Sequence, residues 1–256
     1  MQLSDLPAHW AHLHWDETDS TMCRLRAPEA AARSEEFVLA TADYQLAGRG
    51  QRGTHWEAER GKNLLFGFRF SPRFLRADGQ FRLSEALALA VADAVRSLTG
   101  EAAVKWPNDI YCGDRKVCGM LLEHDLAGAH IATTLTGVGL NVNQQRFTGD
   151  APNPVSLRQI LGHDTDRATL LTDVLRRFEQ NYRRLQAGET ADLDRRYAAS
   201  LYRREGLHPY RDSEGDFMAA IEGVAPDGRL SLRDAQGRVR IYAFKEVAYL
   251  FPDRRA

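Results

Sequence analysis

The sequence predicts an α+β protein, in which a mixed or antiparallel sheet is flanked by helices and followed by a small β-rich domain. Three observations support this class. Residues 36–45 and 63–70 are apolar and β-prone, without a helical stripe. Residues 83–98 and 171–185 instead repeat apolar side chains at helical spacing. After Gly206 the chain changes to short strands separated by glycine-containing turns.

The elements of the first half follow in order from local patterns. The helix at 83–98 should end at Gly100, because glycine favours the left-handed conformation of a helix C-cap. Residues 102–106 form a short strand, and residues 109–125 a hairpin that turns at Gly113 and Asp114. Residues 130–143 predict a strand that runs into a turn marked by glycines.

The second half begins with the helix at 171–185, which ends near Gly188, and a third helix over 191–205. Short strands then follow at 216–224, 228–234, 237–244 and 246–251. Their close, regular spacing favours a small barrel. We therefore expect a catalytic domain at 1–205 and a C-terminal domain at 206–256.

Charge and cysteine usage limit the functional class. A net charge of −1 argues against a general role in binding DNA or membrane surfaces. No apolar run approaches the roughly 20 residues that span a bilayer, and the N-terminus does not resemble a secretion signal. Cys23, Cys112 and Cys118 have no tight spacing, which suggests free thiols in the cytoplasm.

The loop "GRGQRGTHW" at 48–56 is the first candidate site. Its glycines let backbone amides approach an anion closely, and Arg49 and Arg52 add guanidinium groups suited to carboxylate or phosphate. Trp56 could cover a ring or an apolar ligand chain. The alternative is a flexible surface loop with solvated arginines.

Two further segments carry polar groups suited to nucleotide chemistry. In "KWPNDI" (105–110), Asn108 could bind an adenine edge or a metal-bound water, and Asp109 could help to hold Mg²⁺. An ordinary turn explains that segment equally well. In "RKVCGML" (115–121), Lys116 could stabilise phosphoryl charge, and Gly119 could allow close approach of a ligand. The alternative for Lys116 is a surface lysine.

Other polar positions are weaker indications of a ligand site when each is taken alone. Ser20 or Thr21 predicts a helix N-cap, although the same hydroxyls could bond a polar ligand. In "GVGLNVN" (137–143) the glycines indicate tight backbone packing or close approach of a ligand, and Asn141 could donate to a phosphate or to adenosine; a plain turn is the alternative. The histidines of "HWAHLHW" lack the cysteines or carboxylates of a familiar zinc spacing, so we do not expect a metal site there.

The order of these motifs closely resembles biotin protein ligases, from about residue 15 to the C-terminus. "DST", "ADYQLAGRGQRGTHW", "KWPNDI", "RKVCGMLLE" and "GVGLNVN" follow one another, with a small β-domain last. The resemblance implies a class II synthetase-like catalytic domain and an SH3-like C-terminal barrel. It also implies an enzyme that uses MgATP to activate biotin as biotinyl-AMP. The biotin then passes to a lysine of a biotin carboxyl carrier protein or domain of a carboxylase.

The same resemblance assigns roles to individual positions. Lys116 and Arg49 should lie at the reacting centre, and Asp109 should assist Mg²⁺. The biotin-binding set comprises Ser20, Thr21, Gln45, Gly48, Arg49, Lys116 and Gly119. The ATP-binding set comprises Gln51, Arg52, Trp56, Asn108 and Asn141. The loop at 48–55 should become ordered when ligand binds and then shield the intermediate from water.

The sequence differs from the common pattern of biotin protein ligases at two positions of the loop. Gln51 replaces an arginine common in the family, and Thr54 lies where another basic residue is common, so the loop is less cationic. Only about 18 residues precede "DST", so we expect no DNA-binding domain and no repressor function. The rivals are a lipoate protein ligase, a nucleic-acid-binding module and a biotin binder without catalysis. The sequence leaves a homodimer open.

Overall fold

The computed structural model describes residues 3, 6–48, 50, 56–149 and 153–251. The strands of the large sheet are β1 (Trp10–Trp15), β2 (Phe37–Ala42), β3 (Leu64–Phe70), β4 (Ala103–Lys105), β5 (Asp109–Cys112), β6 (Arg115–Ala127) and β7 (His130–Leu140). The helices are α1 (Thr21–Arg26), α2 (Pro28–Ala31), α3 (Phe81–Thr99), α4 (Leu157–Leu161), α5 (Arg167–Gln186) and α6 (Thr190–Ala199). No helix in these ranges is long and apolar enough to cross a membrane.

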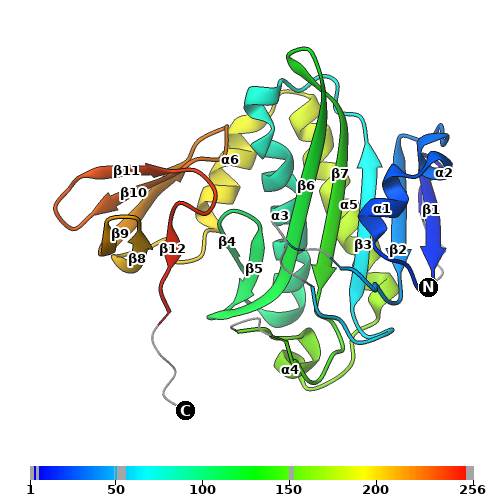
Figure 1. Cartoon of the computed structure of the whole chain (residues 1–256), viewed down its shortest axis with the longest axis horizontal. Coiled ribbons are helices and arrows are strands. Elements are labelled where there is room, and N and C mark those ends of the chain that lie inside the picture. The colour runs from blue at the N-terminus through cyan, green and yellow to red at the C-terminus, as the bar shows by residue number, and fades with distance from the viewer. Residues whose placement is uncertain (1–2, 4–5, 49, 51–55, 150–152, 252–256) are drawn as a thin grey trace.

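The large sheet is mixed, as predicted. Its seven strands have the order β1-β2-β3-β7-β6-β5-β4. Only β1 and β2 pair in parallel, with Trp10 opposite Phe37, and every other neighbouring pair in this sheet is antiparallel. The carboxyl ends of β1 and β2 therefore lie side by side, next to the start of α1 (Figure 1).

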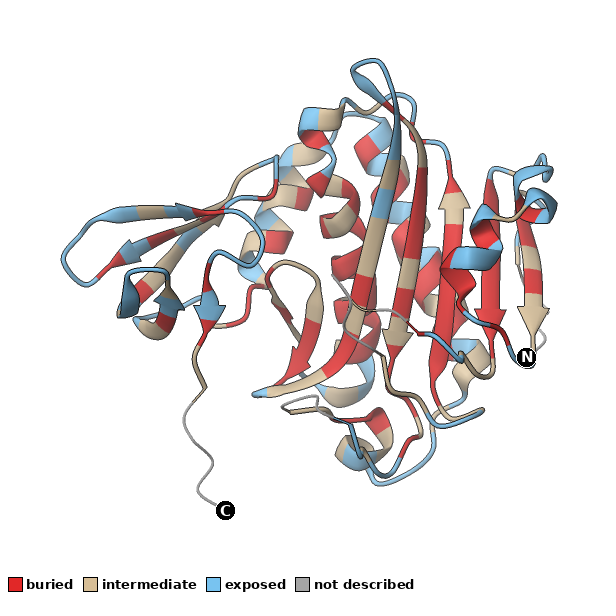
Figure 2. Ribbon diagram, in the orientation of Figure 1, coloured by how far each residue is buried: buried red, intermediate tan, exposed pale blue. Residues whose placement is uncertain are grey.

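Helices cover both faces of this sheet. Figure 1 shows α1 on the near side and α3 and α5 on the far side, and Figure 2 shows the strands between them to be largely buried. Along β2, Phe37 and Leu39 belong to the main core, whereas Val38 and Ala40 pack in a smaller cluster with Leu25 of α1. A strand buried on both faces needs no polar alternation, which explains why every residue of β2 except Thr41 is apolar.

Several predicted boundaries are confirmed. Helix α3 ends at Gly100, which has a φ of 81° and whose amide bonds Arg96 O. Strands β5 and β6 form the predicted hairpin, with Gly113 in the left-handed region at a φ of 54°. The second long helix is α5, and Gly188 follows its end.

Of the two interpretations of the glycines in "GVGLNVN", the turn is wrong and tight packing is confirmed. Strand β7 continues through Gly137 and Gly139 to Leu140 and pairs with β6 throughout that stretch. These glycines instead leave space for two side chains that pack directly against the backbone of β7. A Cβ at Gly137 would lie 2.9 Å from Met22 Cγ, and one at Gly139 would lie 2.3 Å from Trp56 Cε2.

The C-terminal unit is a second, antiparallel sheet. Its strands are β8 (His208–Asp212), β9 (Gly215–Val224), β10 (Leu230–Asp234), β11 (Val239–Tyr242) and β12 (Ala248–Tyr249). Their order is β11-β10-β9-β8-β12, and among the described residues β11 and β12 do not pair to close the sheet into a barrel. The sequence did not predict β1 or β8.

Candidate active site

A cavity of about 850 Å³ opens where α1, the first half of β6, the end of β7, the β4–β5 turn and the segment 244–249 meet. Its lining comes from both sheets, and from residues more than 200 positions apart in the chain. This volume lies within the usual range of about 300–1,000 Å³ for small-molecule sites. Most of the predicted site residues that the structure describes line this one cavity.

One end of the cavity is formed by the start of α1 and the segment after β2. Ser20 caps α1, because its hydroxyl accepts a hydrogen bond from Met22 N, and this confirms the predicted N-cap. Gln45 Oε1 accepts from the backbone N of Thr21 at 2.7 Å and from its hydroxyl at 3.1 Å. Since these bonds orient the carboxamide oxygen, Gln45 has its Nε2 donor left for a ligand.

The floor of the cavity is glycine-rich backbone of β6 and β7. The indole of Trp56 lies over Gly139 and Gly119, and a Cβ on Gly119 would meet it at 2.9 Å. Trp56 Nε1 is buried without a hydrogen-bond partner among the described residues. A ligand acceptor in this slot could satisfy that N–H, so Trp56 gives the site a polar anchor as well as an apolar wall.

The centre of the cavity holds an ion pair. Lys116, the second residue of β6, has its Nζ 2.7 Å from Asp109 Oδ1 at the start of β5. The hairpin register brings the two together, since Lys116 pairs with Tyr111 and Asp109 with Gly119. Lys116 Nζ also lies 5.5 Å from the Trp56 ring centroid. Both side chains are about three-quarters or more buried, so their charges act in a partly dehydrated space.

The two predicted asparagines have fixed orientations. Asn108 lies in the turn between β4 and β5, and its side-chain amide donates to Met120 O. It therefore stabilises the turn and also lines the cavity. Asn141 donates its Nδ2 to Val155 O at 3.2 Å, while its Oδ1 is buried without a partner among the described residues. The Asn141 side chain therefore keeps a buried acceptor, Oδ1, and one further N–H of Nδ2 for a ligand, and its contact with phosphate or adenosine stays a prediction.

The cationic loop was predicted to close the site, but most of it lies outside the described residues. This applies to Arg49, Gln51, Arg52 and Thr54. At the loop's two ends, Trp56 N donates to Gly48 O at 3.0 Å. Gly48 also lies beside Gln45, since its Cβ position is 3.4 Å from Gln45 Nε2. Both ends of the loop are thus tied close to the cavity.

The sequence did not predict two lysines of the cavity wall. Lys105 ends β4, and its Nζ lies 4.7 Å from the ring centroid of Tyr249 in the C-terminal unit. Burial lowers the pKa of Lys105, an effect partly offset by the charge of Asp109. Lys245 comes from the C-terminal unit itself. Lys105 precedes a motif that marked the site, whereas no local pattern distinguishes Lys245.

Comparisons with known proteins agree with this arrangement. Residues 17–141 match the model of the biotin/lipoate A/B protein ligase family. A biotin--[acetyl-CoA-carboxylase] ligase of Mycobacterium tuberculosis is 30% identical over 243 residues, which cover 91% of this chain and 87% of that protein. The enzyme of the same name from Paracoccus denitrificans is 29% identical over 232 residues, covering 86% of this chain and 93% of that one.

The fold has solved counterparts. The biotin protein ligase of Aquifex aeolicus, in complex with biotin and ATP, superposes with a TM-score of 0.77 at 24% identity, covering 93% of this chain and 97% of that chain. Since that coverage includes the C-terminal unit, both sheets have equivalents in that structure. The sequence relatives and the family model together show that this chain belongs to the biotin/lipoate A/B protein ligase family.

Proposed function

We propose that this chain is an ATP-dependent biotin protein ligase. The observation that carries the proposal is the single cavity in which the Lys116–Asp109 pair lies between the Ser20–Gln45 end and the Asn141 end. In the first step a biotin carboxylate oxygen attacks the α-phosphorus of ATP, and pyrophosphate leaves. In the second step the amine of an acceptor lysine attacks the acyl carbon of biotinyl-AMP, loses a proton, and displaces AMP.

The α1 end of the cavity suits the ureido ring of biotin. That ring presents a carbonyl acceptor and two N–H donors. Gln45 Nε2 can donate to the carbonyl, and the hydroxyls of Ser20 and Thr21 can serve as further partners. Met22, which packs against Gly137, adds apolar surface for the rest of the ligand. Buried polar groups of this kind reject ligands that cannot satisfy them.

The Lys116–Asp109 pair suits the reacting centre. No protein nucleophile is required, since the biotin carboxylate attacks. The protein must hold two anions together and stabilise charge on the phosphoryl oxygens, which is the role we assign to Lys116 and to Arg49. Because Asp109 holds Lys116 Nζ, the ammonium group is already oriented before the substrates bind.

Mg²⁺ fits the same centre. It is commonly bound by one or two carboxylates together with substrate phosphates. Asp109 supplies one carboxylate in the cavity wall, and its contact with Lys116 uses Oδ1. We therefore assign Asp109 as the protein ligand for Mg²⁺, which would reduce the repulsion between ATP and biotin.

The remaining wall suits ATP. Asn141 Oδ1 is a buried acceptor, which fits an exocyclic amino group such as that of adenine. Asn108 and Trp56 complete the adenosine side. Lys105 and Lys245 supply positive charge where the C-terminal unit meets the cavity, which suits the departing pyrophosphate.

We place the catalytic unit at 1–205 and the C-terminal unit at 206–256, with a biotin carboxyl carrier protein in the cytoplasm as the acceptor.

The test incubates the purified protein with MgATP and either biotin or lipoate, without acceptor protein. Hydroxylamine traps the acyl-adenylate, and mass spectrometry identifies the hydroxamate. Biotinyl hydroxamate is the expected product. Lipoyl hydroxamate alone would overturn the substrate assignment. Absence of both products from folded protein that binds biotin would overturn the catalytic assignment.

A further inference from the structure

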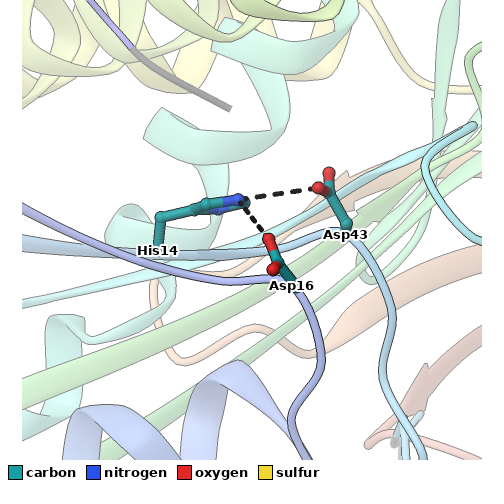
Figure 3. Close-up of side chains that lie close together, drawn as sticks. All are labelled: His14, Asp16 and Asp43. Atoms are coloured by element: carbon teal, nitrogen blue, oxygen red, sulfur yellow. Dashed lines mark ion pairs between the residues drawn. The ribbon is translucent and has the colours of Figure 1, made fainter.

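A histidine and two aspartates converge at the carboxyl ends of the parallel strands β1 and β2. His14 lies near the end of β1, Asp16 follows that strand, and Asp43 follows β2. His14 Nε2 lies 3.8 Å from Asp16 Oδ1 and 3.6 Å from Asp43 Oδ2, and all three ligand atoms fall within 4.8 Å of one another. Figure 3 shows both carboxylates facing the same edge of the imidazole ring.

The surroundings fix the orientation of two of these groups. The hydroxyl of Thr41 lies 2.9 Å from His14 Nδ1, which holds the ring so that Nε2 faces the carboxylates. Arg167 donates to Asp43 Oδ1 at 3.2 Å, and Oδ2 is the oxygen that lies toward His14. Metal-binding imidazoles and carboxylates characteristically have such second partners, which set their direction.

We propose that His14, Asp16 and Asp43 bind one divalent transition-metal ion of the Zn²⁺ class. One imidazole nitrogen with two carboxylate oxygens suits Zn²⁺ and its neighbours better than Mg²⁺ or Ca²⁺, which prefer all-oxygen sites. Three protein ligands leave a position for water. The two carboxylates and Arg167 together carry a net charge of −1, so the site favours a cation.

The sequence could not suggest this site, because its decisive ligand comes from another strand. The three histidines of "HWAHLHW" do not converge on one site, since only His14 reaches the two carboxylates. His9 Nε2 lies 2.7 Å from Glu179, and His12 Nε2 lies 2.8 Å from the Thr41 hydroxyl. Only the parallel pairing of β1 with β2 brings Asp43 beside His14.

A metal ion here would tie together two segments that lead into the active-site cavity. Thr18 N donates to Tyr44 O, and Leu46 N donates to Thr18 O, so the chain after Asp16 pairs with the chain after Asp43. These paired segments carry Ser20 on one side and Gln45 on the other. A bound ion would therefore stabilise the folded state and the wall of the cavity together.

The test is calorimetric titration of tag-free, metal-stripped protein with Zn²⁺ alone, without biotin or ATP, so the result is independent of the proposed enzyme activity. We expect one ion per chain and a rise in melting temperature. Co²⁺ should bind at the same site and give the visible absorption of a bound ion. A large excess of Mg²⁺ should not displace either metal.

Asp16→Ala is the decisive variant, because the Asp16 side chain is 96% exposed and its loss should not affect folding. We expect it to weaken Zn²⁺ binding at least tenfold, and His14→Ala to abolish the binding. His163→Ala, which removes an exposed histidine elsewhere, should leave the affinity unchanged. Absence of stoichiometric binding by the unmodified protein, or an affinity unchanged in Asp16→Ala, would overturn the proposal.

Discussion

At the scale of single residues, the contact between Lys116 and Asp109 is the central feature of the cavity. A lysine is a flexible point charge, and its free ammonium group would sample many positions. The carboxylate of Asp109 limits that freedom by holding Nζ at 2.7 Å. An ammonium group oriented before the reaction costs no reorganisation when charge develops at phosphorus.

Replacing Lys116 with alanine should therefore impair chemistry much more than binding. We expect the rate of biotinyl-adenylate formation to fall about 100- to 1,000-fold, the usual effect of removing one preorganised charge-stabilising donor. The affinity for biotin should change far less. Pyrophosphate release measures the first quantity, and calorimetry with biotin alone measures the second.

Arg115→Ala is the matched control, since Arg115 is the adjacent cation on β6 and does not line the cavity. It should retain the normal rate. If Lys116→Ala also retained its rate, Lys116 would have no role in catalysis.

The sequence predicted most of the cavity residues, but not which of their side-chain atoms are left to bind a ligand. Ser20, Gln45, Asn108 and Lys116 were marked by residue type and order, and the structure brings them to one cavity. The orientation of Asn141 could not be predicted, because it depends on Val155 O, a backbone atom 14 residues away. Lys105 and Lys245 were missed because only the packing of the two sheets places them in the wall.

At the scale of elements, glycines mark places where neighbouring backbones approach closely. Gly67, in β3, lies against the backbone of Thr136 in β7, and the Thr136 hydroxyl bonds both the N and the O of Phe68, the next residue of β3. A Cβ on Gly67 would lie 2.1 Å from the carbonyl oxygen of Thr136. Backbone cannot move aside as a flexible side chain can, so the strands would have to separate.

Gly67→Ala should consequently destabilise the protein by about 1–3 kcal/mol, the usual cost of overpacking a core. Gly223→Ala in β9 is the control, because no atom lies within 4 Å of its Cβ position and its φ is not positive. Urea unfolding followed by circular dichroism gives both free energies. Equal stability of the two variants would contradict the close approach of β3 and β7.

A buried carboxyl group at the contact of α3 and α6 makes stability depend on pH. Burial, and secondarily the charge of Asp194, raise the pKa of Glu85 from 4.5 to about 8. The folded protein therefore keeps this proton at pH values where the unfolded chain has lost it. The contribution of Glu85 to the free energy of unfolding should fall as pH rises from 4.5 through 8.

Glu85→Gln, which cannot ionise, should remove this dependence. The variant should gain stability over the unmodified protein, and the gain should be larger at roughly pH 8.5 than at roughly pH 5.5, since each pH unit is worth about 1.4 kcal/mol. Melting temperatures at both pH values test this. Glu205→Gln is the control, because the Glu205 side chain is 92% exposed. A pH-independent gain would contradict the raised pKa.

Helices and strands could be predicted where a pattern within their own sequence marks them. Helix α3 and the β5–β6 hairpin follow from apolar spacing and from Gly100 and Gly113. Strand β8 begins with His-Pro and carries charged residues, so its sequence has no strand pattern of its own. The glycines of β7 allowed two interpretations, a turn or close packing, and the sequence alone could not decide between them because the packing against Met22 and Trp56 is a tertiary effect.

At the scale of the whole molecule, the C-terminal sheet completes the cavity. Trp106, in the β4–β5 turn, donates its Nε1 to Gly228 O at 2.9 Å. Phe244 packs edge-on against Trp106, with ring centroids 5.3 Å apart, and also lines the cavity. These contacts place Lys245 and Tyr249 in the cavity wall, in the part that we assign to ATP.

Phe244→Ala should therefore affect ATP use more than biotin binding. Loss of an aromatic contact is worth about 0.5–1.5 kcal/mol, so we expect KM for ATP to rise roughly two- to thirteenfold. The Kd for biotin should change by less than about twofold on the same scale. Ile241→Ala is the matched control, because Ile241 is 60% exposed on the same sheet and lies outside the cavity. An equal loss of biotin affinity in Phe244→Ala would mean that the C-terminal unit supports the whole cavity. An unchanged KM for ATP would mean that the C-terminal unit does not contribute to the nucleotide site.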